Sequence, residues 1–212
     1  MQIKTNQDTT FYPFYIFPLL YVVSVYQLPF TFSMSEDSAL ASNLMYLPLV
    51  FGILNIIVAV KFCKPENRIM MLQAALLIKY ALIPFFIIGG MAVGISFLLS
   101  FIPVPFMIFV GPMVALVGTV MGWLVLAFEA PYAIAYLRLS AKESLLSKAF
   151  MILHIVVQFF FTLDVIDIMY LSFKEHRWTK LTIVVIVLLA VAILLLLIMI
   201  ALAIAGILTT ST

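Results

Sequence analysis

The sequence has very little charge. Only 9% of its 212 residues are Asp, Glu, Lys or Arg, whereas 66% are hydrophobic. These few polar side chains cannot cover the surface of a soluble globular protein. The chain therefore needs lipid as its solvent. The net charge of +2 is small, and the basic residues lie at the ends of apolar runs instead of in one patch, which argues against a nucleic-acid partner. The composition therefore predicts an integral membrane protein whose first partner is the lipid bilayer.

The chain is equally poor in residues that bind metals. It has one cysteine, Cys63, and two histidines, His154 and His176. One cysteine allows no intrachain disulfide, and two histidines allow no multi-histidine metal site. The motifs H-E-x-x-H, G-x-S-x-G and G-x-x-x-x-G-K-[ST] are absent from the sequence. We therefore expect no metal and no cofactor, and zinc proteases, serine hydrolases and nucleotide-driven pumps lose their usual sequence support.

Long apolar runs with few charges fill most of the chain. A helix needs about 20 apolar residues to cross roughly 30 Å of hydrocarbon. Six segments predict an all-α, polytopic bundle of six transmembrane helices in a single membrane domain, residues 1–212; they are residues 11–32, 41–62, 69–94, 107–137, 149–173 and 181–208. Between the third and fourth segments, Pro103 and Pro105 predict an outer turn or a shallow re-entrant piece over residues 95–106.

The distribution of Lys and Arg predicts the orientation. With the N-terminus inside, seven basic residues face the cytoplasm and three face the opposite side, which favours both termini in the cytoplasm of a plasma or inner membrane. The three exceptions, Lys174, Arg177 and Lys180, follow the fifth segment. Its uncharged part, residues 149–163, covers only about 22 Å at helical rise. If this segment enters and returns, the bundle has five crossings plus one re-entrant segment, and that alternative stays open.

Two charges lie near the middle of the expected spans. Counted from the nearest basic loops, Lys79 and Glu129 each lie roughly 15 Å from the cytoplasmic boundary, near mid-membrane. An unpaired charge at that depth is costly, so we expect Lys79 and Glu129 to form an intramembrane charge pair. A face shared with Glu129 carries small residues, which predicts close packing of the third and fourth spans, with Gly90 near the depth of Gly118. These small residues are Gly111, Ala115, Gly118 and Gly122.

Prolines follow both buried charges. Pro84 lies five residues after Lys79 and Pro131 two residues after Glu129, and each predicts a kink because it removes a helical hydrogen bond. Broken helices beside intramembrane charges are typical of transporters. A buried charge pair can equally well fix only the packing of two helices. Both interpretations stay open at this point.

Two further polar groups are expected at different depths. Near the cytoplasm, an inner polar layer predicts either a hydrated vestibule or hydrogen bonds between helices; its residues are Asn55, Gln73, His154 and Gln158. Near the outer boundary, an outer polar cluster contains carboxylates suited to cation binding, acid–base chemistry or marking the interface; its residues are Gln27, Asp164 and Asp167.

Three classes of function follow. The first is a small-solute or ion translocator, or the substrate-binding membrane subunit of one, with Lys79, Glu129 and His154 along its path. The alternative is a structural, accessory or regulatory membrane protein. An enzyme that uses Asp164 and Asp167 at the outer face is third. A small-molecule or ion ligand, a partner subunit and a second copy of the chain are compatible with these classes. A water-accessible cavity at Lys79 and Glu129 would favour transport, and a dry pair would favour the structural class.

Overall fold

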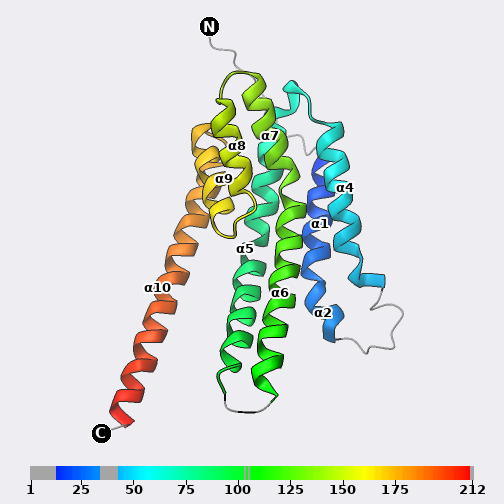
Figure 1. Cartoon of the computed structure of the whole chain (residues 1–212). Helices are drawn as coiled ribbons and strands as arrows, with labels where there is room; N and C mark the ends of the chain where they lie inside the picture. The colour runs from blue at the N-terminus through cyan, green and yellow to red at the C-terminus, as the bar shows by residue number, and fades with distance from the viewer. Residues whose placement is uncertain (1–12, 34–42, 103, 105, 211–212) are drawn as a thin grey trace. The chain divides into compact units, whose positions relative to one another are not determined.

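The computed structural model describes residues 13–33, 43–102, 104 and 106–210 (Figure 1). Every regular element in these ranges is a helix, so the predicted all-α class is confirmed. The chain forms two compact units, Met1–Ile168 and Met169–Thr212.

The first unit contains most of the helices. Their bounds are η1 (Pro13–Tyr15), α1 (Ile16–Tyr26), α2 (Leu28–Ser33), α4 (Leu47–Lys61), η2 (Pro65–Asn67), α5 (Arg68–Leu99), α6 (Met107–Glu129), α7 (Pro131–Lys142) and α8 (Lys148–Val157). The helix α9 (Leu163–Lys174) crosses the boundary between the units, and α10 (Thr179–Thr210) belongs to the second unit.

Four helices in the described ranges are long and apolar enough to cross a membrane: Asn43–Lys61, Pro65–Leu99, Met107–Glu129 and Thr179–Ile198. They correspond to the second, third, fourth and sixth expected spans, and they are compatible with a membrane location. The first expected span begins in residues outside the described ranges. From Pro13 onward it is divided, because α1 ends at Tyr26 and α2 begins at Leu28, one residue before Pro29.

The two prolines beside the buried charges act differently. Pro131 is the first residue of α7, so the expected fourth span, residues 107–137, is divided into α6 and α7 at Ala130. Proline is well tolerated at the first position of a helix, where its missing N–H would have no helical acceptor. Pro84 lies inside α5, which continues without interruption to Leu99. The helix therefore extends beyond residue 94, where the third span was expected to end.

The expected fifth span, residues 149–173, is not one continuous helix. His154 Nδ1 contacts the Asp167 carboxylate, although 13 residues of straight helix would separate them by about 20 Å. The helices α8 and α9 therefore fold back on each other as a hairpin (Figure 1). With 10 and 12 residues, they measure roughly 15 and 18 Å, too short to cross hydrocarbon. The prediction of a single helix was wrong because residues 158–162, Gln-Phe-Phe-Phe-Thr, contain no Pro or Gly to signal the turn.

The helices α5 and α6 form a long, closely packed antiparallel hairpin (Figure 1). A Cβ atom placed on Gly111 would lie 2.6 Å from the Ser96 carbonyl oxygen, and one on Gly118 would lie 2.8 Å from the Val93 side chain. Close packing along this small-residue face is therefore confirmed. Gly90 would meet nothing within 4 Å, so its expected place near Gly118 is taken by Val93, almost one helical turn further along α5.

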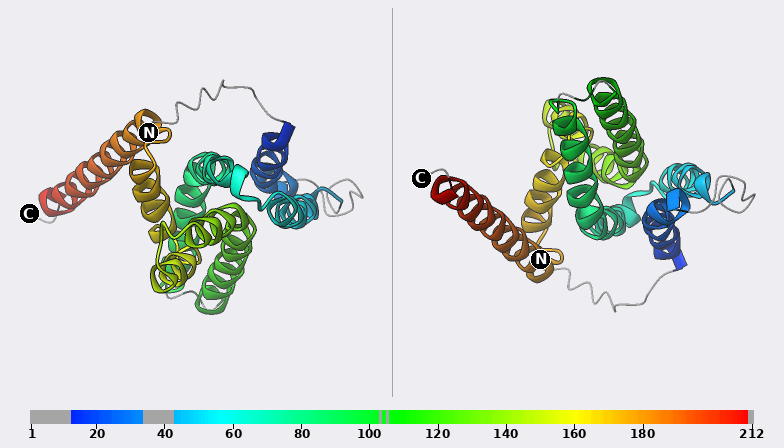
Figure 2. Two further views of the ribbon diagram at one scale, coloured as in Figure 1. Left: turned by 90° about the horizontal axis from the view of Figure 1, so that it is seen from above. Right: turned by 90° about the horizontal axis from the view of Figure 1, so that it is seen from below.

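The helices α1 and α4 pack against this hairpin. Figure 2 looks along the helices from both ends and shows α1 and α4 lying together beside α5 and α6. Tyr21 of α1 is completely buried, and its hydroxyl donates to the Val125 carbonyl oxygen of α6 at 2.8 Å. This contact joins α1 to the same helix that carries Glu129.

In the second unit, the chain turns sharply between α9 and α10. The Ser172 hydroxyl donates to the Arg177 carbonyl oxygen at 2.5 Å and lies 2.7 Å from the Thr182 hydroxyl. Residues 172 and 182 would be about 15 Å apart in a straight helix. His176 and Trp178 have φ angles of 51° and 54°, which allow the chain to reverse within a few residues.

Candidate functional site

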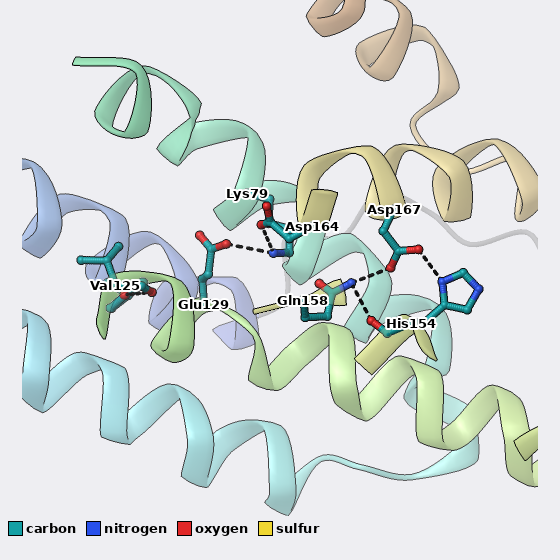
Figure 3. A network of polar contacts seen from close by, with 8 residues as sticks. Lys79, Val125, Glu129, His154, Gln158, Asp164 and Asp167 are labelled. Carbon is teal, nitrogen blue, oxygen red and sulfur yellow. Dashed lines mark hydrogen bonds and ion pairs between the residues drawn. The ribbon is translucent and has the colours of Figure 1, made fainter. Parts of the chain in front are cut away.

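Lys79 lies at the centre of a buried ionic cluster. Its Nζ atom donates to Glu129 Oε1 at 2.8 Å and to Asp164 Oδ2 at 2.5 Å (Figure 3). The three side chains expose 0%, 1% and 2% of their surface. The structure thus brings Lys79 and Glu129 together, as expected, and adds Asp164 as a second carboxylate. We call Lys79, Glu129 and Asp164 the buried triad.

Three helices supply the buried triad. The antiparallel arrangement of α5 and α6 brings Lys79 level with Glu129, the last residue of α6. Asp164 lies in the first turn of α9, where a carboxylate is favoured by the helix dipole. The fold-back of α8 and α9 is what carries this aspartate to Lys79. The triad therefore exists only because the fifth apolar segment is a hairpin.

A second polar group lies next to Asp164 on the same hairpin. His154 Nδ1 contacts Asp167 Oδ1, and Gln158 Nε2 donates to Asp167 Oδ2 at 2.5 Å and to the His154 carbonyl oxygen at 3.4 Å (Figure 3). The His154 side chain is 14% exposed and that of Asp167 is 7% exposed. This group is therefore less enclosed than the buried triad. We call His154, Gln158 and Asp167 the hairpin group.

The buried triad combines two carboxyl groups with one ammonium. When Glu129 and Asp164 are both ionised, it carries one excess negative charge, whereas Asp167 is in contact with His154. Glu129 Oε2 and Gln158 Oε1 are completely buried and accept no hydrogen bond from any described residue. An uncompensated charge away from water costs several kcal/mol or more. In that state the triad needs one additional positive charge, from a proton or a monovalent cation.

The buried triad lies nearer one end of the α5–α6 hairpin than was expected. Beyond Lys79, α5 continues for 20 residues to Leu99, about 30 Å. Before Glu129, α6 contains 22 residues, about 33 Å. Each length is close to the full thickness of a hydrocarbon core. Because α5 is longer than predicted, Lys79 and Glu129 belong to the half of the hairpin that adjoins the basic loops.

The expected inner polar layer does not form a single group. The Tyr132 hydroxyl donates to Asn55 Oδ1 at 3.0 Å and joins α7 to α4, while the Tyr15 hydroxyl donates to Gln73 Oε1 at 2.8 Å and joins η1 to α5. His154 lies in the hairpin group instead. Among the described contacts, these residues make hydrogen bonds between helices and not a shared vestibule.

The expected outer polar cluster is not formed either. Gln27 Nε2 donates to the Leu44 carbonyl oxygen at 2.6 Å, whereas Asp164 and Asp167 contact Lys79 and His154. The two aspartates lie apart from Gln27 because α9 folds back along α8. The three basic residues that follow the fifth segment were the signal in the sequence that could have placed them.

One pocket of the described structure lies away from the buried triad. It has a volume of about 320 Å³ and lies between α4 and the α6–α7 pair, and none of Lys79, Glu129 and Asp164 lines it. Within the described ranges, no group of three His, Cys, Asp or Glu residues is arranged to hold a metal ion. The side chains of the triad itself are almost completely buried.

Comparison with known proteins adds a family. Searches of curated proteins and of solved structures each find no similar chain. A family of unknown function, DUF6652, matches residues 15–178. The match includes the buried triad and the hairpin group and ends just before α10. Because it covers well over half of the chain, this protein belongs to the DUF6652 family of unknown function.

Proposed function

We propose that this protein is a multi-pass membrane protein that binds and translocates a proton or a small monovalent cation at the buried triad. The observation that carries the proposal is the charge of the triad, in which Lys79 faces both Glu129 and Asp164 with no water-exposed surface. A buried excess charge lowers stability, which favours binding of a proton or a cation at the triad. With both carboxyl groups ionised, the triad becomes neutral when it binds one proton or one small monovalent cation.

The surroundings of the triad support exchange of that cation. The unpartnered Glu129 Oε2 is an acceptor available to a proton or cation. The hairpin group provides His154, an imidazole in contact with Asp167, on the same hairpin as Asp164. Short, broken helices that bring polar side chains to membrane depth are typical of ion pathways. We therefore assign entry from the basic end of the bundle, through the hairpin group to the triad.

The experiment is an ion-flux measurement in proteoliposomes. The purified full-length protein is reconstituted with an internal pH indicator, and a potassium–valinomycin potential drives the flux. We expect proton entry above that of empty liposomes, lost in Glu129→Gln and retained in Glu143→Gln, since Glu143 pairs with Arg68 outside the triad. The same test with sodium or potassium gradients assigns the cation. Absence of flux for all three cations from correctly folded protein would reject the proposal.

A second candidate function is supported by the burial of the site. Because the three side chains of the triad are almost completely buried, the ionic contacts could serve only to fasten α5, α6 and α9 in a structural or accessory membrane protein. In that case Glu129→Gln would leave the cellular role of the protein intact. The catalytic role considered for Asp164 and Asp167 has less support, because Asp164 is committed to Lys79 and Asp167 to His154.

The membrane arrangement belongs to the same proposal. We assign one membrane domain with five crossings, formed by α1–α2, α4, α5, α6–α7 and α10, and we assign α8–α9 as the re-entrant segment. All basic residues other than Lys79 then lie on the cytoplasmic side, as expected from the positive-inside rule. They are Lys4, Lys61, Lys64, Arg68, Arg138, Lys142, Lys148, Lys174, Arg177 and Lys180. The N-terminus is then cytoplasmic and the C-terminus is external, in place of two cytoplasmic termini.

A further inference from the structure

We propose that the groove between α4 and the α6–α7 pair binds a phospholipid with an anionic headgroup, independently of the buried triad. The groove has a volume of about 320 Å³, which falls at the lower end of the roughly 300–1,000 Å³ of ligand sites in proteins. One acyl chain lies along the groove, and the headgroup phosphate contacts Arg138.

The walls of the groove suit a hydrocarbon chain. Ile56, Ala59 and Val60 of α4 form one side, and Ala127 and Ile134 form part of the other. Because the alanine side chains on both sides are small, an open space remains between the helices. A polar solute would lose its hydrogen bonds with water there and find almost none in return. An acyl chain has no hydrogen bonds with water to lose, and it fills the space with van der Waals contacts.

The cationic end of the groove selects the headgroup. Arg138 is the charged residue of the lining; its side chain is exposed, and no described carboxylate forms an ion pair with it. Lys61 and Lys64 flank the lining residue Cys63 and are also exposed. Guanidinium groups bind phosphate through two parallel hydrogen bonds, and basic pockets between helices on the cytoplasmic side bind anionic headgroups. The charge of this end therefore favours an anionic phospholipid over a zwitterionic one.

The first test is lipid binding measured by native mass spectrometry of the full-length protein in detergent. Phosphatidylglycerol and phosphatidylcholine with identical acyl chains are titrated separately. We expect phosphatidylglycerol to bind more tightly, and Arg138→Gln to weaken it by about fivefold while leaving phosphatidylcholine unchanged. Lys148→Gln is the matched control, because Lys148 is exposed and basic but does not line the groove. Equal affinity for both lipids, or an equal loss in Lys148→Gln, would overturn the proposal.

The second test locates the acyl chain. Cys63 lines the groove and is the single cysteine of the chain, so its alkylation by N-ethylmaleimide reports occupancy directly. We expect phosphatidylglycerol to slow alkylation in the wild-type protein and not in Arg138→Gln. Ala127→Phe, which fills the groove without changing its charge, should weaken binding of both lipids. Unchanged alkylation in the wild-type protein is decisive even if Ala127→Phe does not fold, because it would place the lipid outside the groove. A dimer that forms without lipid and is lost in Ala127→Phe would assign the groove to a second copy instead.

Discussion

At the residue scale, the members of the buried triad are not equivalent. Lys79 is the cation shared by two carboxylates, so its removal breaks both ion pairs. Removal of either carboxylate leaves the other one paired with Lys79. The consequences of substitution should therefore depend on which charge is removed. This asymmetry allows the contribution of the triad to stability to be separated from its role in binding a cation.

Lys79→Met should lower the free energy of unfolding by about 3–5 kcal/mol, because it leaves Glu129 and Asp164 buried without a counter-charge. Glu129→Gln should cost about 1 kcal/mol or less, because Lys79 and Asp164 remain as a neutral pair and the amide keeps its hydrogen-bonding capacity. Both are measured by SDS-induced unfolding in mixed micelles. Equal losses in the two variants would mean that Asp164 does not share the charge of Lys79.

Removing all three charges should restore stability. The double variant Lys79→Met with Glu129→Leu still contains Asp164 without a partner, so we expect it to remain unstable. Adding Asp164→Leu replaces the whole ionic cluster by apolar side chains, an exchange that is often neutral or stabilising. The triple variant should therefore unfold near the wild-type midpoint and carry no ion flux. A double variant as stable as the triple one would show that Asp164 is accessible to water.

At the element scale, two features set the geometry of the site. The first is the close approach of α5 and α6, and the second is the turn between α8 and α9. Each depends on a small number of backbone positions, and each can be tested without touching a charged residue.

Gly111→Ala should destabilise the α5–α6 hairpin by about 1–3 kcal/mol, because its Cβ would collide with a backbone oxygen of α5 that cannot easily move. Gly90→Ala is the matched control on the opposite helix. A Cβ there meets nothing within 4 Å, and alanine is favoured over glycine inside a helix by roughly 0.5–1 kcal/mol. Thermal unfolding in detergent should thus move in opposite directions for the two variants.

The turn between α8 and α9 can be tested at Thr162, which has a φ of 71°. A β-branched residue is unfavourable in this region and glycine is not. Thr162→Gly should therefore stabilise the protein by about 1 kcal/mol, whereas Ile152→Gly, in the middle of α8, should destabilise it by roughly 0.5–1 kcal/mol. If residues 149–173 formed one straight helix, glycine would be harmful at both positions. The two unfolding midpoints therefore discriminate the hairpin from a continuous span.

At the scale of the whole molecule, the number of crossings decides on which side the residues after α9 lie. In a Cys63→Ser background, Lys174→Cys should react with a membrane-impermeant maleimide only after the membrane is opened, because five crossings place it in the cytoplasm. Ser100→Cys, in the turn between α5 and α6, should react from outside and serves as the control. Labelling of both cysteines in intact cells would favour six crossings and two cytoplasmic termini.

The sequence alone determined those properties that depend on local composition. Its scarcity of charge predicted helices in lipid, and the spacing of Lys79 and Glu129 from the ends of their runs predicted that they would meet. Helical periodicity also predicted the close contact of Gly111 and Gly118 with the neighbouring helix. These features follow from the regular rise and turn of a helix, which can be counted along the chain.

Only the tertiary structure decided that the fifth segment is a hairpin and not one continuous helix. Its residues 158–162 carry no Pro or Gly, so no local signal indicates that the chain reverses there. The reversal depends on long-range contacts, since Asp164 pairs with Lys79, 85 residues away, and Asp167 with His154. A buried Lys79 facing Glu129 alone would be a neutral pair. The hairpin adds Asp164 as a second carboxyl group and converts that pair into the triad on which the proposed function depends.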